Sequence, residues 1–218
     1  MFFQNKKIVI TAGPTYEAID PVRFIGNRST GKMGIAIAEV FAEKGAEVIL
    51  ILGPTHLRPQ HKNIKCSLVE TGDEMYKNCL TYFDWCDVAV MSAAVADYKP
   101  KEIASQKIKK KEETITITLV KTIDILFELG KLKRKQFLVG FALETENLLE
   151  NAQAKLKRKN LDLIIANTSN DKGEGFGFDT NKIIIIDRNN KMYNFELKQK
   201  EEVAKDIVDT IEKCLITQ

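Results

Sequence analysis

The sequence has few of the residues that build disulfide frameworks or zinc sites. Of 218 residues only four are cysteines and two are histidines, and no two cysteines form a C-x-x-C pair. His56 and His61 share one polar stretch, "THLRPQH". Disulfide scaffolds and zinc sites both need clustered cysteines or histidines. We therefore expect free thiols in a reducing compartment.

Long apolar runs are also missing. The start "MFFQNKK" holds no apolar stretch long enough for a secretion signal. No run elsewhere approaches the roughly 20 apolar residues of a membrane-spanning helix. We therefore expect a cytoplasmic protein without a membrane partner. The net charge of +3 is slight and gives no reason to expect a nucleic acid partner.

Strand and helix signals alternate along the chain. Short β-branched or continuously apolar segments predict strands at 7–11, 46–53, 64–70, 87–95, 136–143 and 161–168. Apolar residues at helical spacing predict helices at 31–45, 72–85, 123–133, 146–159 and 201–215. Strands that are apolar throughout belong to parallel sheets covered on both faces. We expect one α/β domain over residues 1–218, with a Rossmann-like, mostly parallel sheet and helices on both faces.

Several segments interrupt this alternation. A loop of roughly twenty residues follows the first strand, and loops of that length tend to be functional. Residues 97–113 are lysine-rich and are expected to form a flap. "TITITLV", residues 114–120, has the period of two that predicts a strand. A glycine-rich segment at 170–178 leads to a predicted hairpin at about 181–198, which turns at Asn189 and Asn190.

The segment "GNRSTGKM", residues 26–33, is close to the phosphate-loop pattern G-x-x-x-x-G-K-[ST] but does not complete it. Met33 stands where a hydroxyl should ligate magnesium. A phosphate loop also follows its strand directly, whereas the first strand here ends near Thr11. The dinucleotide pattern G-x-G-x-x-G is absent as well, because "TAGPT" offers one glycine. Both common nucleotide motifs are therefore disfavoured.

The same segment still suits an anion. Gly31 opens the next predicted helix, and unpaired backbone N–H groups at a helix start can bind anions. Asn27 offers a neutral amide, and Arg23 and Arg28 offer guanidinium groups. Spacing alone leaves an alternative open, in which the neighbouring serine and threonine cap the helix and the arginines are solvated.

Four motifs in a fixed order resemble the phosphopantothenate–cysteine ligases, the ligase part of bacterial Dfp-type proteins. They are "ITAGPTYEAIDPVRFIGNRSTGKMG", "MSAAVADYKP", "KIKKK" and "VGFALETE". The likeness extends from Ile8 to the hairpin. It implies condensation of 4′-phosphopantothenate with L-cysteine in coenzyme A biosynthesis. CTP would form an acyl-cytidylate and release pyrophosphate, and the cysteine amine would then expel CMP. Mg²⁺ is implied, and a flavin is not.

The resemblance assigns catalytic roles to three residues. Asn27 matches an asparagine that acts on the acyl-nucleotide, and Lys107 matches a lysine needed to form that intermediate. Arg23 matches an arginine suited to the phosphate or carboxylate of phosphopantothenate. Gly26 and Thr30 replace the family's usual serines.

The resemblance also implies contacts with the nucleotide and the substrate. Ala94 falls in the substrate set with Asn27 and Arg23, and Asp124 is the expected magnesium-side carboxylate. Ile123 stands where the family has a proline. The nucleotide contacts implied are Ser92, Ala93, Asp97, Lys107, Ile123, Asp124, Ile125, Leu126, Phe141, Lys155 and Lys159.

Plainer interpretations exist for several of these residues. A lysine run is usually a solvated face, and Lys155 and Lys159 also suit a helix C-terminus. An NAD(P)-dependent reductase and a non-catalytic nucleotide-binding module remain alternative functions. Asn27 and Lys107 favour the ligase, because neither alternative needs them. No side chain selects CTP over ATP.

The resemblance further implies a homodimer, and we expect 114–120 to form part of its interface. About six residues precede the first strand. We therefore expect the flavin-dependent decarboxylase that often precedes this ligase to lie outside this chain. A separate decarboxylase partner and a shortened sequence are the two alternatives.

Overall fold

The structure, a computed structural model, describes residues 1–110, 113–144, 147–168 and 178–217. Its elements in chain order are β1 (Lys7–Ala12), β2 (Tyr16–Ala18), β3 (Phe24–Gly26), α1 (Lys32–Glu43), β4 (Glu47–Leu52), β5 (Ile64–Leu68), α2 (Gly72–Phe83), β6 (Val88–Met91), β7 (Tyr98–Pro100), β8 (Leu119–Lys121), α3 (Ile125–Leu132), β9 (Phe137–Glu144), α4 (Leu148–Arg158), β10 (Leu163–Thr168), β11 (Thr180–Asp187), β12 (Met192–Gln199) and α5 (Lys200–Ile216).

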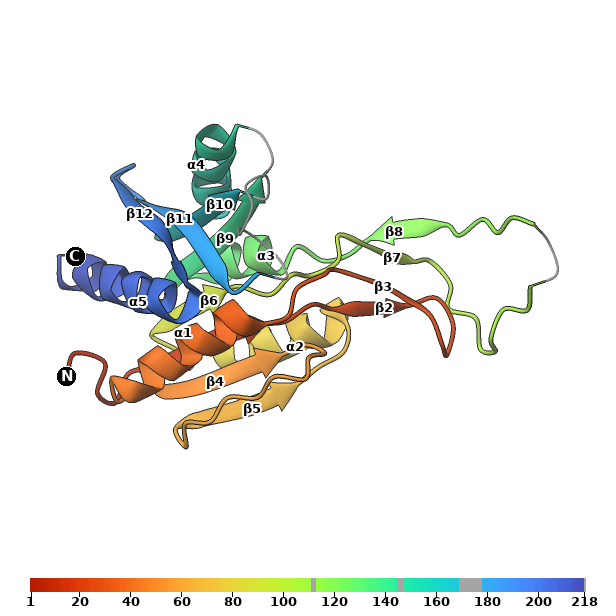
Figure 1. Cartoon of the computed structure of the whole chain (residues 1–218), viewed down its shortest axis with the longest axis horizontal. Coiled ribbons are helices and arrows are strands. Elements are labelled where there is room, and N and C mark those ends of the chain that lie inside the picture. The colour runs from red at the N-terminus through yellow and green to blue at the C-terminus, as the bar shows by residue number, and fades with distance from the viewer. Residues whose placement is uncertain (111–112, 145–146, 169–177, 218) are drawn as a thin grey trace.

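The main sheet has eight strands in the order β12-β11-β10-β9-β6-β1-β4-β5 (Figure 1). The strands from β10 to β5 run parallel, while β11 pairs antiparallel with both β10 and β12. Numbered along the chain, the parallel strands β5-β4-β1-β6-β9-β10 have the order 3-2-1-4-5-6 of the dinucleotide-binding fold. The predicted Rossmann-like sheet and the C-terminal hairpin are confirmed.

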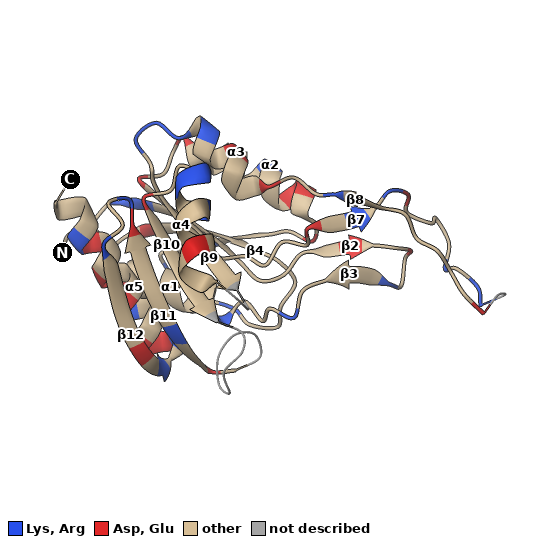
Figure 2. Ribbon diagram, turned by 90° about the horizontal axis from the view of Figure 1, so that it is seen from above, with Lys and Arg blue, Asp and Glu red and all other residues tan. Residues whose placement is uncertain are grey.

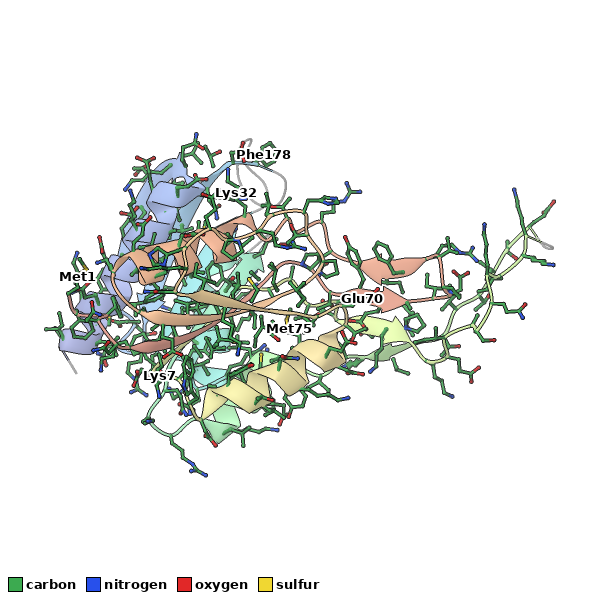
Figure 3. The ribbon with its side chains drawn as sticks, turned by 90° about the horizontal axis from the view of Figure 1, so that it is seen from below. Met1, Lys7, Lys32, Glu70, Met75 and Phe178 are labelled. Carbon is green, nitrogen blue, oxygen red and sulfur yellow. The ribbon has the colours of Figure 1, made fainter. Side chains whose placement is uncertain are left out.

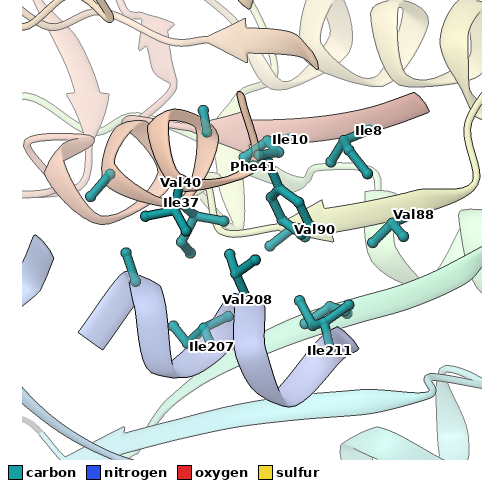
Figure 4. Close-up of a cluster of buried hydrophobic side chains, with 14 of the residues drawn as sticks. Ile8, Ile10, Ile37, Val40, Phe41, Val88, Val90, Ile207, Val208 and Ile211 are labelled. Atoms are coloured by element: carbon teal, nitrogen blue, oxygen red, sulfur yellow. The ribbon is translucent and has the colours of Figure 1, made fainter. Parts of the chain in front are cut away.

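Helices cover both faces of the sheet, as predicted. On one face, side chains of α1 and α5 meet over the central strands, with Ile37 and Val40 near Val208 and Ile211 (Figure 4). On the other face, α2, α3 and α4 pack over a second apolar cluster. Burying each such aliphatic side chain contributes about 1.5–3 kcal/mol.

The strand β1 shows why the central strands are apolar throughout. Ile8 and Ile10 belong to the cluster under α1 and α5, whereas Val9 belongs to the cluster on the opposite face. Successive side chains of a strand point to opposite faces, so a strand covered on both sides buries every residue.

Two strand pairs project from the sheet as an arm, defined here as residues 16–26 and 97–122 (Figure 1). The predicted loop after the first strand is therefore partly wrong, because it contains the hairpin β2–β3. Ala104 N donates to Ile19 O at 3.0 Å and ties the two halves of the arm together. The predicted flap is the outer part of this arm, and Figure 2 shows basic residues along it.

The strand predicted at 114–120 is mostly wrong, because β8 begins only at Leu119. Ile115 is 57% exposed, so the period-two pattern has no buried face to support it. Its proposed role in an interface stays a prediction. Lys111 and most of the glycine-rich segment at 170–178 lie outside the described residues.

The strand predicted at 87–95 also ends early, at Met91. Beyond it the chain bonds across to the loop after β1, since Ala94 N donates to Gly13 O at 2.9 Å. The remaining elements lie close to their predicted positions. Asn190, in the predicted turn, has a φ of 61°, the left-handed conformation that asparagine tolerates. In the described part of the chain, no helix is long and apolar enough to cross a membrane.

A substitution at Gly34 tests how closely α1 packs against the sheet. A Cβ at Gly34 would lie 2.5 Å from both Ala12 Cβ and Ser92 Oγ. Alanine is the better helix former by about 1 kcal/mol. We nevertheless expect Gly34→Ala to lower the free energy of unfolding by about 1–3 kcal/mol, because the added methyl overpacks the site.

Denaturant unfolding measures this change, with Glu43→Ala on the exposed end of α1 as the matched control. The control is expected to stay within about 0.5 kcal/mol of the parent. A Gly34→Ala protein as stable as the parent would contradict the packing described here.

Candidate functional site

A cleft of ≈ 710 Å³ lies above the carboxyl ends of the central strands. It spans the point between β1 and β6 where the strand order reverses, which is where open α/β sheets bind ligands. The predicted residues that line it are Asn27, Ser92, Ala93, Ala94, Asp97, Ile123, Asp124, Ile125, Leu126, Phe141, Lys155 and Lys159.

The start of α1 forms one wall of the cleft. Gly31 is its N-cap, with a φ of 79° and no side-chain cap. A Cβ there would lie 3.2 Å from Gly13 N, so both conformation and space favour glycine. The first N–H groups of a helix lack partners within the helix and attract anions. The hairpin β2–β3 separates β1 from this helix, which confirms that the segment is not a phosphate loop.

Asn27 is held at the rim of the cleft by backbone carbonyls. Its Nδ2 donates to Ala94 O at 3.0 Å and to Val95 O at 3.2 Å. These bonds fix the amide against the loop after β6. A ligand oxygen that takes a hydrogen bond from this amide must compete with the two carbonyls.

The loop after β6 is fastened to the end of β1. Ser92 Oγ donates to Thr11 O at 2.6 Å, and Ala93 N donates to Thr11 Oγ1 at 3.2 Å. Further along, Thr122 N donates to Asp97 O at 3.0 Å, which joins this loop to the chain leading into α3. The small side chains at 92–94 leave the backbone open to a ligand.

Asp124 lies where α3 begins and is paired with a lysine. Its Oδ1 accepts hydrogen bonds from Lys159 Nζ at 2.7 Å and from Phe127 N at 3.1 Å. Burial works to raise the pKa of Asp124, but these two hydrogen bonds and the nearby charges of Lys159 and Lys155 outweigh it and lower the pKa overall. Asp124 is therefore an ionised carboxylate at neutral pH.

Lys155 and Lys159 reach the cleft from the end of α4. Lys155 Nζ donates to Phe141 O at 2.7 Å, at the carboxyl end of β9. The side chain of Lys159 is only 9% exposed. Two ammonium groups one helical turn apart repel each other, and an anion bound between them relieves that repulsion.

The residues present fit Mg²⁺ only as an ion shared with a substrate. The described residues contain no group of three or more histidine, cysteine or acidic side chains placed to hold a metal. Mg²⁺ is commonly held by one or two carboxylates together with substrate phosphates. Asp124 and Asp97 both line the cleft and suit that arrangement.

Arg23 and Lys107 do not line the cleft of their own chain. Arg23 Nε donates to Asp20 Oδ2 at 3.0 Å, and Arg23 Nη2 donates to Ile108 O at 3.1 Å. Lys107 is exposed on the arm next to Ile108. The arm thus holds two of the predicted catalytic residues together, away from the third.

Other cleft residues were not predicted from the sequence. Lys32, Asn167, Asn181 and Lys200 also line the cleft. Lys32 belongs to the phosphate-loop-like segment, which was a usable signal. Asn181 and Lys200 flank the C-terminal hairpin, and only the antiparallel return of β11 brings them to the carboxyl edge of the sheet.

Comparison with known proteins identifies the family. The family described as DNA/pantothenate metabolism flavoprotein C-terminal domain matches residues 3–215. The chain belongs to this family. The resemblance to the ligase part of Dfp-type proteins is thereby confirmed.

Curated members of this family are longer than the chain. A coenzyme A biosynthesis bifunctional protein CoaBC from Bacillus subtilis is 44% identical over 208 residues, which cover 95% of this chain and 51% of that protein. A protein named cysteine/cysteine sulfinic acid decarboxylase, from an unknown prokaryotic organism, is 51% identical over 95% of this chain and 58% of its own length. The chain thus spans about half the length of these relatives.

Solved structures of family members share the fold. The crystal structure of the C-terminal domain of a CoaBC protein matches with a TM-score of 0.86 and 40% identity, covering 100% of this chain and 99% of that one. A Cab2 mutant in complex with phosphopantothenate-cysteine matches with a TM-score of 0.79, over 98% of this chain and 89% of that one. At 18% identity the second match supports the fold alone.

Asp124→Asn tests the charge at the entrance to α3. Asparagine caps helices as well as aspartate does, so this change isolates the ion pair with Lys159. We expect the free energy of unfolding at neutral pH to fall by about 1 kcal/mol, between the values for exposed and buried pairs.

The effect should depend on pH with a definite sign. Because folding lowers the pKa of Asp124, its stabilisation is present above the ordinary value of 3.8 and is lost as the pH falls through the lower folded value. Unfolding curves at neutral and acidic pH measure the gap, with Glu128→Gln as control. A gap that widens in acid would contradict this assignment.

Proposed function

We propose that this protein is a phosphopantothenate–cysteine ligase that uses CTP. The observation that carries the proposal is that Asn27 lines the same cleft as most of the residues that the family resemblance predicts to contact the nucleotide. Family membership and the names of the CoaBC relatives support a role in coenzyme A biosynthesis. A reductase is disfavoured, because the loop after β1 lacks the dinucleotide glycines.

The cations of the cleft suit a nucleoside triphosphate. Lys155 and Lys159 lie at one end, and the start of α1 lies at the other. There Ser29 Oγ and Thr30 Oγ1 accept hydrogen bonds from Gly31 N and Lys32 N at 3.3 and 3.4 Å. Asp124 would hold Mg²⁺ together with phosphate oxygens, and the ion would neutralise charge on the departing pyrophosphate. The exposed backbone of Ala93 and Ala94 can approach the base or ribose, and it is our candidate for the selection of CTP.

In the first step the carboxylate of 4′-phosphopantothenate attacks the α-phosphorus of CTP. A new oxygen–phosphorus bond forms, the bond from the α-phosphorus to the bridging oxygen breaks, and pyrophosphate leaves. The product is an acyl-cytidylate, whose carbonyl carbon is more electrophilic than that of a carboxylate. Positioning two anions together is the main task of the protein here.

In the second step the amine of L-cysteine attacks the acyl carbon. Negative charge develops on the carbonyl oxygen, and the Asn27 amide is our candidate donor to it. The carbon–nitrogen bond forms, the amine loses a proton, and CMP leaves with the electrons of the broken carbon–oxygen bond. Losing one such donor typically costs about 2.7–4 kcal/mol in the barrier.

We further propose a homodimer in which the arm of each chain serves the cleft of its partner. Arg23 and Lys107 lie on the arm, where Arg23 also bonds to the backbone of Ile108. Val22 and Ile103 on the same arm are 60% and 63% exposed, as expected of a surface that a second copy covers. The arm would then bring Arg23 to phosphopantothenate and Lys107 to the triphosphate.

The relatives' names include further activities. We propose the ligase activity alone for the residues of this chain, which span 58% and 51% of these two relatives. The reaction uses soluble metabolites, in keeping with a cytoplasmic protein.

Pyrophosphate release tests the function directly. CTP or ATP is supplied with 4′-phosphopantothenate, and cysteine is alternately added and withheld. We expect release that requires phosphopantothenate, favours CTP and continues over many turnovers only with cysteine. Equal use of ATP would overturn the preference for CTP. No release with either nucleotide would leave a non-catalytic binding module.

Mixing two inactive variants tests the shared site. Asn27→Asp and Lys107→Gln homodimers are each expected to be inactive. If the arm acts across the dimer, each mixed dimer contains one complete site, and random mixing restores about a quarter of the parent activity.

Each variant unfolded and refolded alone is the matched control and should stay inactive. If the mixed dimers recover no activity, Lys107 and Asn27 of one chain act in the same site. A protein that remains monomeric by light scattering would rule out the dimer itself.

A further inference from the structure

Asn181 is a buried polar side chain with an unmet hydrogen bond. It is 4% exposed and lines the cleft from the start of β11. Among the described residues, no donor lies within hydrogen-bonding distance of its Oδ1. A buried acceptor left without a donor costs about 1–3 kcal/mol, and such groups are rare in folded proteins. A ligand that donates to Oδ1 would remove this cost.

Lys200 lies on the same wall of the cleft. In the β11–β12 ladder Asn181 faces Lys198 and Thr180 faces Gln199, and the ladder continues with Lys200 N donating to Asp179 O at 2.9 Å. Lys200 is the first residue of α5, directly after this ladder, and its side chain lines the same cleft as Asn181. Lys200 Nζ donates to Phe178 O at 2.6 Å.

A second lysine stands close to this pair. Lys32 Nζ, at the start of α1, lies 2.8 Å from Asp179 Oδ1 and 3.2 Å from Glu201 Oε1. Figure 3 shows Lys32 near Phe178. Burial, and then the charge of Lys32, lowers the pKa of Lys200. Because Asp179 and Glu201 balance the charge of Lys32, the attraction for an anion here comes mainly from Lys200.

The side of the cleft formed by Asn181 and Lys200 therefore suits a ligand that carries an N–H or O–H donor next to a negative charge. In CTP and 4′-phosphopantothenate the O–H and N–H donors lie farther from the nearest negative charge, and the lysines of α4 already suit the triphosphate at the other side of the cleft. An α-amino acid carries both groups on one carbon. The Asn181 oxygen matches the amine, and Lys200 matches the carboxylate.

We propose that Asn181 and Lys200 form the subsite for the amino acid co-substrate. Asn181 Oδ1 accepts a hydrogen bond from the α-amino group, and Lys200, with Lys32 beside it, faces the α-carboxylate. The assignment rests on the proposed ligase function and adds the binding site of the nucleophile. The neutral amide takes no proton, so Asn181 acts as a positioning residue that holds the amine toward the acyl carbon.

Asn181→Leu is the variant that separates this role from a structural one. Leucine has nearly the same size and removes the unmet acceptor, so the melting temperature should stay the same or rise. We expect the KM for cysteine to increase about tenfold or more, because the amine then meets an apolar group. The KM values for CTP and phosphopantothenate, and pyrophosphate release without cysteine, should stay unchanged.

Two further variants complete the test. Asn194→Ala, on the exposed face of the same hairpin, is the matched control and should leave every KM unchanged. Lys200→Met should reduce the preference for cysteine over cysteamine, which lacks the carboxylate. If Asn181→Leu does not fold, Asn181→Ala serves with the same readouts.

The outcomes are distinct from those that test the ligase itself. An unchanged KM for cysteine would overturn the subsite, and so would a lower melting temperature without a kinetic effect. An increase in the KM for CTP or phosphopantothenate instead would assign Asn181 to that substrate. If the parent protein releases no pyrophosphate, the ligase proposal fails first and the subsite falls with it.

Discussion

The contact between α1 and the ends of β1 and β6 determines where the cleft lies. Ser92 Oγ bonds to the carbonyl of Thr11, and Gly34 sits so close to both strands that no side chain fits there. Since the crossovers from β1 and β6 lead to opposite sides, the strand ends separate above this contact. The start of α1 is thereby held at the bottom of the opening. Gly34 and Ser92, which form this contact, both line the cleft.

The arm is organised by one buried carboxylate. The guanidinium of Arg23 holds the pKa of Asp20 well below its usual range, and Asp20 Oδ2 also accepts from Ile108 N at 3.0 Å. One acidic side chain thus ties the hairpin β2–β3 to the lysine-rich segment opposite. Arg23 and Lys107 are consequently carried by one unit. In the proposed dimer this unit can deliver both cations to the same cleft.

Periodicity was enough to predict the sheet and helices, because burial on two faces leaves a continuous apolar signal in the strands. It failed where long-range contacts decide the structure. Residues 114–118 alternate like a strand but have no face to bury, and the chain after Met91 leaves the sheet to bond with the loop after β1. Most of the residues predicted through the family motifs do line the cleft. Asn181 could not be predicted, because it is distinguished by a buried Oδ1 without a partner among the described residues, which only a folded chain reveals.

The positions of the charged side chains in the cleft explain why residues 26–33 lack the hydroxyl of a phosphate loop. A phosphate loop needs a hydroxyl after its lysine because the magnesium ion sits at the helix start. Here the carboxylate suited to magnesium is Asp124, at the start of α3 and beside the lysines of α4. Lys32 is instead engaged by Asp179 and Glu201. The proposed reaction therefore does not need a hydroxyl at the position of Met33. In the proposed reaction the start of α1 would face the acyl group and its nucleophile, and the metal and the pyrophosphate would lie at the opposite end of the cleft.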